Sequence, residues 1–159
     1  MIRILFIFLV LMLFVKVQAK EEKKVEFSVW KVVDCLGRNK HDSLKEMLSG
    51  QLQEKDGIED QIKNICQFVS GLPVKKEITC RQKHIYNYDT AGNIINDTVV
   101  FRVRFRTQAN LSYKMIIKWC KYCPKNSGET GISYISVHYL GQKEDYISDT
   151  IKTVVTIKQ

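Results

Sequence analysis

The chain has 159 residues, of which 45% are apolar and 26% are charged, and its formal net charge at pH 7 is +8. With only 8 glycines and 2 prolines, the composition excludes a collagen-like or low-complexity chain, and the apolar fraction is too high for a disordered charged tail. We therefore expect one domain that is large enough to bury its own core.

The first nineteen residues have the pattern of a secretory signal. Arg3 supplies a positive charge, residues 4–15 form an unbroken apolar run of 12 residues, and residues 17–19 fit a small-residue cleavage site. The run is too short to span a bilayer, which needs about 20 apolar residues. We expect a signal peptide over residues 1–19 and one secreted domain over residues 20–159. Cleavage would remove two basic residues and no acid, which lowers the net charge from +8 to +6.

All five cysteines follow the expected cleavage site, and an oxidising compartment would favour their pairing. Because five is odd, at most two bridges form within one chain, and one thiol is left over or pairs between chains. We expect Cys35 to pair with Cys66, since both fall on predicted neighbouring helices. Cys80 would then pair across strands with Cys120 or Cys123.

Apolar residues in the first half of the domain recur at helical spacing. They predict a helix over residues 25–36 that stops at Gly37, and a short second helix over residues 42–49 that stops at Gly50.

A third helix is predicted to begin at Asp56, whose carboxylate would cap it with Glu59 as the partner in a capping box. Gly71 would end this helix. Its apolar stripe consists of Ile58, Ile62, Ile65, Phe68 and Val69.

After Pro73 the apolar period changes to two, which is typical of strands. Strands are predicted within 74–88 and over 99–106, 111–119, 131–140 and 151–157, with turns at 89–93 and 108–110 and a polar loop at 124–130. Helices followed by such strands predict an α+β fold, in which the N-terminal helices pack on one face of a curved antiparallel sheet.

This order of elements resembles the nuclear transport factor two-like superfamily, whose curved sheet forms a cone around the helices. Residues 56–62 continuing to 68–71, and residues 113–119 followed by 131–137, resemble a family of uncharacterised exported domains in that superfamily. The resemblance spans residues 25–140. It implies a cone that holds a small apolar molecule or an acid–base site, or one that is filled by side chains while the outer sheet face forms a homodimer.

Five basic residues alternate along two predicted strands. Arg102, Arg104 and Arg106 share one face of the first strand, and Lys114 and Lys118 share one face of the next. If these strands are antiparallel neighbours, all five residues lie on one surface, which would attract sulfated glycans, phosphates, acidic lipids or an acidic protein. The same row also fits a solvated face kept soluble by charge. Nucleic acid is not expected, because no aromatic residues are interleaved on that face.

Residues 67–71 read Gln-Phe-Val-Ser-Gly, a Q-x-V-x-G spacing that resembles the first inhibitory hairpin of cystatins, which block papain-like proteases. A hairpin would expose Phe68 and Val69, whereas the predicted third helix would bury them. The Pro-Trp pair of the second cystatin hairpin is missing from the late turns of this sequence.

The CxxC spacing of Cys120 and Cys123 invites a redox interpretation, but a reactive first thiol needs a helix N-terminus, and this pair closes a predicted strand. The histidines, His41, His84 and His138, share no spacing with a nucleophile, a carboxylate or a second cysteine pair. We therefore expect no catalytic residue, no metal and no cofactor.

Asn96 and Asn110 begin sequons at predicted turns and are candidate glycosylation sites. The sequence as a whole predicts a secreted, cationic, disulfide-supported binding protein. Its ligand would be a small apolar molecule in the cone or an anionic partner on the basic row. A cystatin-like protease inhibitor is the first alternative, and a cavity enzyme of the superfamily is the second.

Overall fold

The structure is a computed structural model that describes residues 27–123, 127–142 and 153–158. The expected signal peptide over residues 1–19 lies outside these residues, as does the start of the predicted loop at 124–130. The helices are α2 (Val29–Gly37), α3 (His41–Glu46), α4 (Gly50–Gln53) and α5 (Ile58–Phe68). The strands are β1 (Thr79–Tyr88), β2 (Ile94–Arg106), β3 (Leu111–Tyr122), β4 (Gly131–Gln142) and β5 (Thr153–Lys158).

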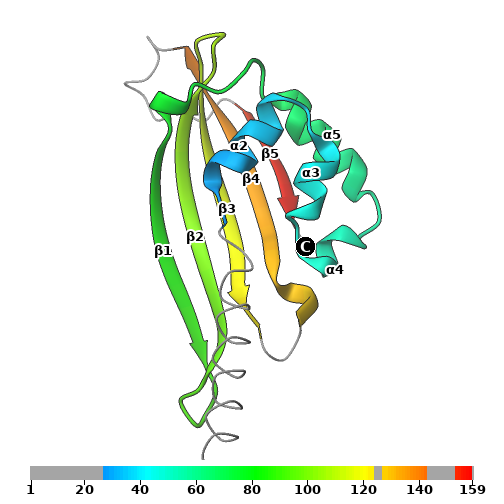
Figure 1. Ribbon diagram of the computed structural model, residues 1–159, viewed down its shortest axis with the longest axis vertical. Helices are drawn as coiled ribbons and strands as arrows, with labels where there is room; N and C mark the ends of the chain where they lie inside the picture. Colours follow the sequence, from blue (N-terminus) through cyan, green and yellow to red (C-terminus); the bar gives the residue numbers. More distant parts are fainter. Residues whose placement is uncertain (1–26, 124–126, 143–152, 159) are drawn as a thin grey trace, which may run out of the picture.

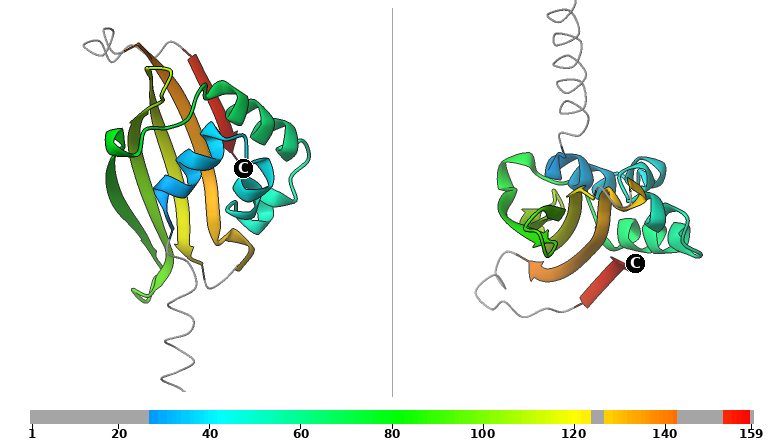
Figure 2. Two further views of the ribbon diagram at one scale, coloured as in Figure 1. Left: turned by 45° about the horizontal axis from the view of Figure 1, so that its top comes forward. Right: turned by 90° about the horizontal axis from the view of Figure 1, so that it is seen from below.

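The strands form a single antiparallel sheet in the order β1-β2-β3-β4-β5, so each strand pairs with its neighbours in the sequence. The sheet is curved, and the helices lie on its concave side (Figures 1 and 2). This arrangement confirms the predicted α+β fold, with N-terminal helices packed on one face of a curved antiparallel sheet.

The predicted strands lie close to the observed ones. Those over residues 99–106, 111–119 and 131–140 form the central parts of β2, β3 and β4. The segment 74–88 differs, because a short 3-10 helix, η1 (Lys75–Glu77), precedes β1 and explains its imperfect alternation. A second 3-10 helix, η2 (Ser127–Glu129), leads into β4.

The concave sheet face and the helices share one core. Val103, Met115 and Val137 lie opposite one another on β2, β3 and β4, and none of them has accessible surface. Because side chains with no accessible surface leave no water-sized space beside them, this part of the interior is filled. The helices contribute residues that are at most 3% exposed: Val32, Val33, Leu36, Leu44, Leu52, Ile58, Ile62 and Ile65.

Tyr113 joins the end of α5 to β3. The backbone N–H of Ser70 donates to the Tyr113 hydroxyl at 3.0 Å, and that hydroxyl donates to the carbonyl oxygen of Phe68 at 3.4 Å. The Tyr113 ring stacks on Phe105 with 5.3 Å between ring centroids. Burial raises the pKa of the Tyr113 hydroxyl, so the group stays protonated and able to donate.

The second predicted helix ends earlier than expected. α3 stops at Glu46 because the chain then pairs with the start of β4: the Ile132 N–H donates to the Met47 carbonyl at 2.9 Å, and the Ser49 N–H donates to the Ile132 carbonyl at 2.9 Å. Gly50 was predicted as a stop, but it begins α4 instead.

The predicted capping box of the third helix is wrong. Gly57 occupies the cap position of α5 with φ 72°, in the left-handed region that favours glycine, and the cap has no side-chain hydrogen bond. Asp56 is exposed, and Glu59 instead forms an ion pair with Lys45 of α3 at 2.7 Å. The carboxylate at Glu59 therefore joins two helices rather than capping its own.

Gly131 is required where the chain before α4 crosses β4. A Cβ at Gly131 would lie 2.8 Å from the Ser49 nitrogen, whereas a Cβ at Gly92, in the β1–β2 turn, would meet nothing within 4 Å. Both glycines have positive φ, 122° and 83°. Gly92→Ala should therefore cost only the backbone strain, about 1–2 kcal/mol. Gly131→Ala should cost a further amount of about 1–3 kcal/mol from overpacking.

Urea unfolding of the two variants measures this difference, with Gly92→Ala as the matched control. Equal losses in the free energy of unfolding would contradict the close approach of Gly131 to Ser49.

Candidate functional site

The basic row predicted from the sequence lies on the convex face of the sheet. Arg104 is directly opposite Lys114, and Lys118 is opposite Val100. Arg102 and Arg106 occupy the same face of β2 as Arg104, because alternate residues of a strand point the same way. The strand register therefore brings all five predicted residues onto one surface, whose curvature follows the sheet (Figure 2).

The first strand adds two basic residues that the sequence analysis did not assign to this surface. Arg81 is directly opposite Arg102, and Lys83 is opposite Val100. The two residues alternate within 74–88, but this alternation alone could not place them on the same surface as Arg102. That placement depends on the register between β1 and β2. We call this surface the basic face, and it comprises Arg81, Lys83, Arg102, Arg104, Arg106, Lys114 and Lys118.

An acid and an aromatic ring lie against two of the side chains of this face. Arg106 forms an ion pair with Glu77 of η1, and the Lys118 ammonium lies 5.1 Å from the centroid of the Tyr134 ring. Within the described parts of β1, β2 and β3, the positions that point outward hold no aspartate or glutamate. Two like-charge pairs, Arg81–Arg102 and Arg104–Lys114, face each other directly, an arrangement that destabilises a sheet.

The pKa of His138 depends on the positive charge of this face. It lies opposite Lys114 on β4, and its Nε2 is 3.1 Å from the Ser136 hydroxyl oxygen. Burial lowers the pKa of His138, and the positive charge of Lys114 lowers it further. The imidazole therefore senses the charge of the basic face without adding to it at neutral pH.

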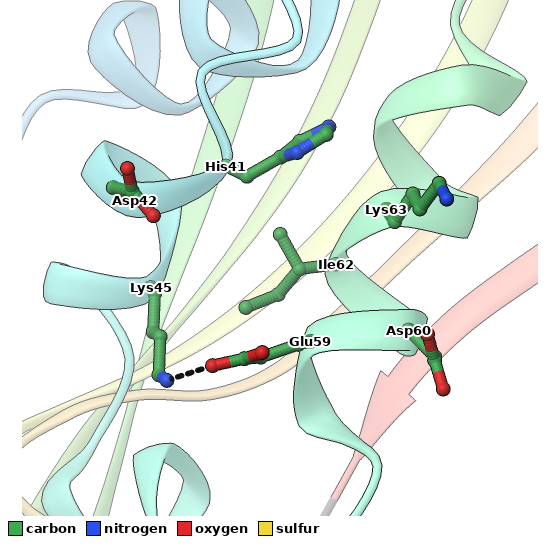
Figure 3. Close-up of a pocket in the computed structure, with 7 residues that line it drawn as sticks. All are labelled: His41, Asp42, Lys45, Glu59, Asp60, Ile62 and Lys63. Atoms are coloured by element: carbon green, nitrogen blue, oxygen red, sulfur yellow. Dashed lines mark hydrogen bonds and ion pairs between the residues drawn. The ribbon is translucent and has the colours of Figure 1, made fainter.

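A groove of about 300 Å³ lies between α3 and α5 (Figure 3). The ion pair between Lys45 and Glu59 crosses it, and the hydrogen bond from Lys45, together with its charge, lowers the pKa of Glu59. The lining residues are His41, Asp42, Lys45, Glu59, Asp60, Ile62 and Lys63. Charges of both signs meet here, and no group of three or more metal-ligating side chains is found among the described residues.

None of the five cysteines is joined by a disulfide in the structure. Cys35 of α2 and Cys66 of α5 are both buried, and the two helices pack together. Burial and, to a lesser extent, the neighbouring Cys35 together raise the pKa of Cys66 to about 12. The two thiols that we expected to pair are therefore neighbours in the core.

The expected pairing of Cys80 with Cys120 or Cys123 is wrong. Cys80 lies opposite Val103 of β2, whereas Cys120 lies opposite Thr98. The separation of five residues along β2 corresponds to about 17 Å, and a disulfide needs Cα atoms within about 7 Å.

Cys120 instead neighbours Cys123 at the end of β3. Burial raises the pKa of Cys120 to about 11, and the nearby Cys123 contributes to the rise. The Cys123 thiol donates to Glu129 Oε2 at 3.1 Å. A raised pKa leaves little thiolate at neutral pH, so the surroundings of Cys120 disfavour the thiolate that a redox site uses.

The two sequons occupy different environments. Asn96 was predicted in a turn, but it lies within β2 and is half-buried, and its side-chain oxygen accepts a hydrogen bond from the Thr98 hydroxyl at 2.7 Å. Asn110 is exposed in the turn between β2 and β3, with φ 59°. Of the two asparagines, Asn110 is therefore the accessible one.

The segment that resembles a cystatin hairpin is packed into the protein. Phe68 is the last residue of α5 and contacts the core, and Val69 is 3% exposed. The exposed tip that the resemblance to cystatins requires is therefore not formed by residues 67–71.

Residues 31–153 match the model of a family described as a domain of unknown function (DUF5104). No curated protein matches the chain. In the part of the chain that the structure describes, no helix has the length and apolar character needed to cross a membrane.

The electrostatic coupling on the basic face can be measured at His138. Lys114→Gln should raise the pKa of His138, because it removes the charge that opposes protonation. Arg106→Gln is the matched control, since it removes the same charge from β2, which is two strands away from His138 on β4. An NMR titration of the His138 ring gives both values, and an unchanged pKa in Lys114→Gln would contradict the placement of Lys114 beside the imidazole.

Proposed function

The chain belongs to this family of unknown function, DUF5104, and from the geometry we propose that it is a non-catalytic protein that binds an anionic partner on the basic face. The observation that supports this proposal is the direct opposition of like charges, Arg81 with Arg102 and Arg104 with Lys114.

The repulsion within these like-charge pairs distinguishes a face that binds an anion from a face whose charges only keep the protein soluble. Like charges directly opposite each other on a sheet cost up to about 1 kcal/mol per pair. A solvated face gains nothing from that cost, because charges of alternating sign would keep it equally soluble. An anion bound between the opposed cations removes their repulsion and is attracted by their summed field.

A flexible linear polyanion, such as a sulfated glycan, suits this face best. The face is convex (Figure 2), so a flat lipid surface would meet few of the basic side chains at once. The two like-charge pairs occupy successive outward positions, about 7 Å apart along the strands. Successive anionic groups of a polymer can therefore meet them in turn.

We also propose that the fold is a nuclear transport factor two-like cone with a filled interior. The curved sheet wrapped around the helices supports the cone, and the absence of accessible surface at Val103, Met115 and Ile117 supports the filling. For this reason we favour an anionic partner on the outer face over a small apolar ligand inside the cone.

The two alternative functions have less support. A cystatin-like inhibitor needs residues 67–71 as an exposed wedge, and Val69 is buried. A cavity enzyme needs titratable groups that converge on an open interior, and the central inner-face residues of β2, β3 and β4 are apolar and fully buried.

Binding to immobilised heparin, a sulfated glycan, tests the proposal. Arg102→Glu combined with Lys114→Glu should weaken binding about tenfold or more and lower the salt concentration needed for elution, because charge attraction is screened by salt. Lys31→Glu combined with Lys63→Glu is the control, since it makes the same change in net charge at exposed positions on α2 and α5.

Equal losses in the two double variants would show that only net charge matters and would contradict a site on the basic face. Tighter binding to vesicles of anionic lipid than to heparin would replace the glycan by a membrane as the partner.

We further propose export after cleavage behind Ala19, with Asn110 as the glycan acceptor where the host glycosylates exported chains. In that compartment, Cys35 would bond to Cys66 and Cys120 to Cys123, and the thiols in each pair would transfer two electrons and two protons to a disulfide-bearing oxidant. Peptide mapping of the secreted protein without reductant should then find these two bridges and a free Cys80. A bridge that contains Cys80 would contradict this assignment.

A further inference from the structure

β1 is the longer of the two edge strands in the described sheet, with ten residues against six in β5. It forms the rim that lies away from α3, α4 and α5 (Figure 1). Ile85, Tyr86 and Tyr88 on this strand are 43%, 44% and 58% exposed. An edge strand displays unpaired N–H and C=O groups, onto which a further strand can add.

The hairpin turn after β1 shows which of its backbone groups point outward. The Asp89 N–H donates to the Asn93 carbonyl at 2.9 Å, so the backbone of Asp89 is directed toward β2. Successive residues of a strand bond alternately to one side and to the other. The odd-numbered residues of β1 therefore bond to β2, and the even-numbered residues direct their N–H and C=O groups away from the sheet. These residues are Cys80, Gln82, His84, Tyr86 and Tyr88.

The next hairpin turn gives the same assignment independently. The Thr107 N–H donates to the Leu111 carbonyl at 3.0 Å, so the odd-numbered residues of β2 bond to β3. The even-numbered residues of β2 then bond to β1, and Arg102 among them lies opposite Arg81. Both turns therefore assign the odd-numbered residues of β1 to the ladder with β2.

A second copy of the chain can add to this edge in a small set of registers. Two copies that meet at the edge are related by a two-fold axis, so the pairing is the same in both directions. Residues that face each other across an antiparallel pair point to the same side of the sheet. The axis must therefore pass through one residue of β1, and each choice of that residue defines one register.

The two cations of β1 exclude three of these registers. An axis through Arg81 or Lys83 places that residue opposite its own copy, and an axis through Gln82 places Arg81 opposite Lys83. Like charges directly opposite each other destabilise a sheet. An axis through His84 leaves no cation opposite a cation.

The axis through His84 also satisfies all the outward backbone groups of β1. Across the two copies, its pairs are Cys80 with Tyr88, Gln82 with Tyr86, and His84 with His84. Each such pair exchanges two hydrogen bonds, so every even-numbered residue of the strand gains a partner. An axis shifted by one residue leaves the groups at one end of β1 without a partner. Charge and hydrogen bonding therefore select the same register.

We propose that the protein is a homodimer in which β1 pairs antiparallel with β1 of a second copy around His84. The pairing joins the two described sheets into one continuous sheet, with both concave faces on the same side. The basic faces of the two copies then lie next to each other on the convex side. This interface is separate from the proposed anion site, because association between copies is measured without any anion present.

The side chains beside the axis fit this pairing. On the concave side, the exposed rings of Tyr86 and Tyr88 gain uncharged neighbours from the second copy. On the convex side, Ile85 lies opposite Lys83, whose aliphatic stem can cover it while the ammonium group stays in water. Arg81 lies diagonal to Asp89 of the second copy, a spacing that long side chains reach.

Analytical ultracentrifugation of the secreted protein tests the dimer. Gln82→Pro should weaken association about tenfold or more, because proline has no N–H and two hydrogen bonds are lost per dimer. The ladder with β2 stays intact, since proline is tolerated where the N–H of an edge strand faces outward. Gln82→Ala keeps the N–H and is the matched control. A protein that stays monomeric across the micromolar range, or a dimer that Gln82→Pro does not weaken, would overturn the proposal.

Disulfide trapping tests the register and does not depend on the proline variant. With Cys80→Ser as the background, His84→Cys should form a bond between copies in oxidised glutathione, because Cα atoms paired at the axis are about 5.5 Å apart. Gln82→Cys should form none, since its two copies are four residues apart along the ladder, about 14 Å. Electrophoresis without reductant separates the two outcomes. Trapping through Gln82→Cys, or no trapping through His84→Cys, would contradict the pairing around His84.

Discussion

The register of the antiparallel sheet is the constraint on which the rest of the structure depends. It places Val103, Met115 and Val137 in one row facing the helices and, on the same strands, Arg104, Lys114 and His138 in one row facing outward. Because side chains alternate along a strand, a slip of one residue would exchange these two rows. Core packing therefore fixes the position of every charge on the basic face.

Local sequence patterns predicted the elements better than the connections between them. The alternation over 99–106 and the helical spacing around Ile62 and Ile65 are local, and both predictions were confirmed. The early end of α3 was not predictable from its own residues, since it depends on hydrogen bonds to Ile132, far away in the sequence. Gly57, in the left-handed conformation, similarly displaced the capping box expected at Asp56.

The candidate sites show the same limit. The alternating arginines of β2 could be seen in the sequence, but the opposition of Arg81 and Arg102 could not, because it depends on which residues of β1 and β2 pair. In the same way, the pairing register excludes the bridge expected between Cys80 and Cys120.

The position of β1 at the rim of the sheet has a consequence for how the protein survives at high concentration. All ten of its residues are exposed, and its outer side has no neighbouring strand in the described sheet. Such an edge is a template onto which another chain can add, and proteins commonly block it with charged residues. Arg81 and Lys83 place two such charges on this edge. Any evolutionary loss of charge at this rim would weaken the solubility of the protein.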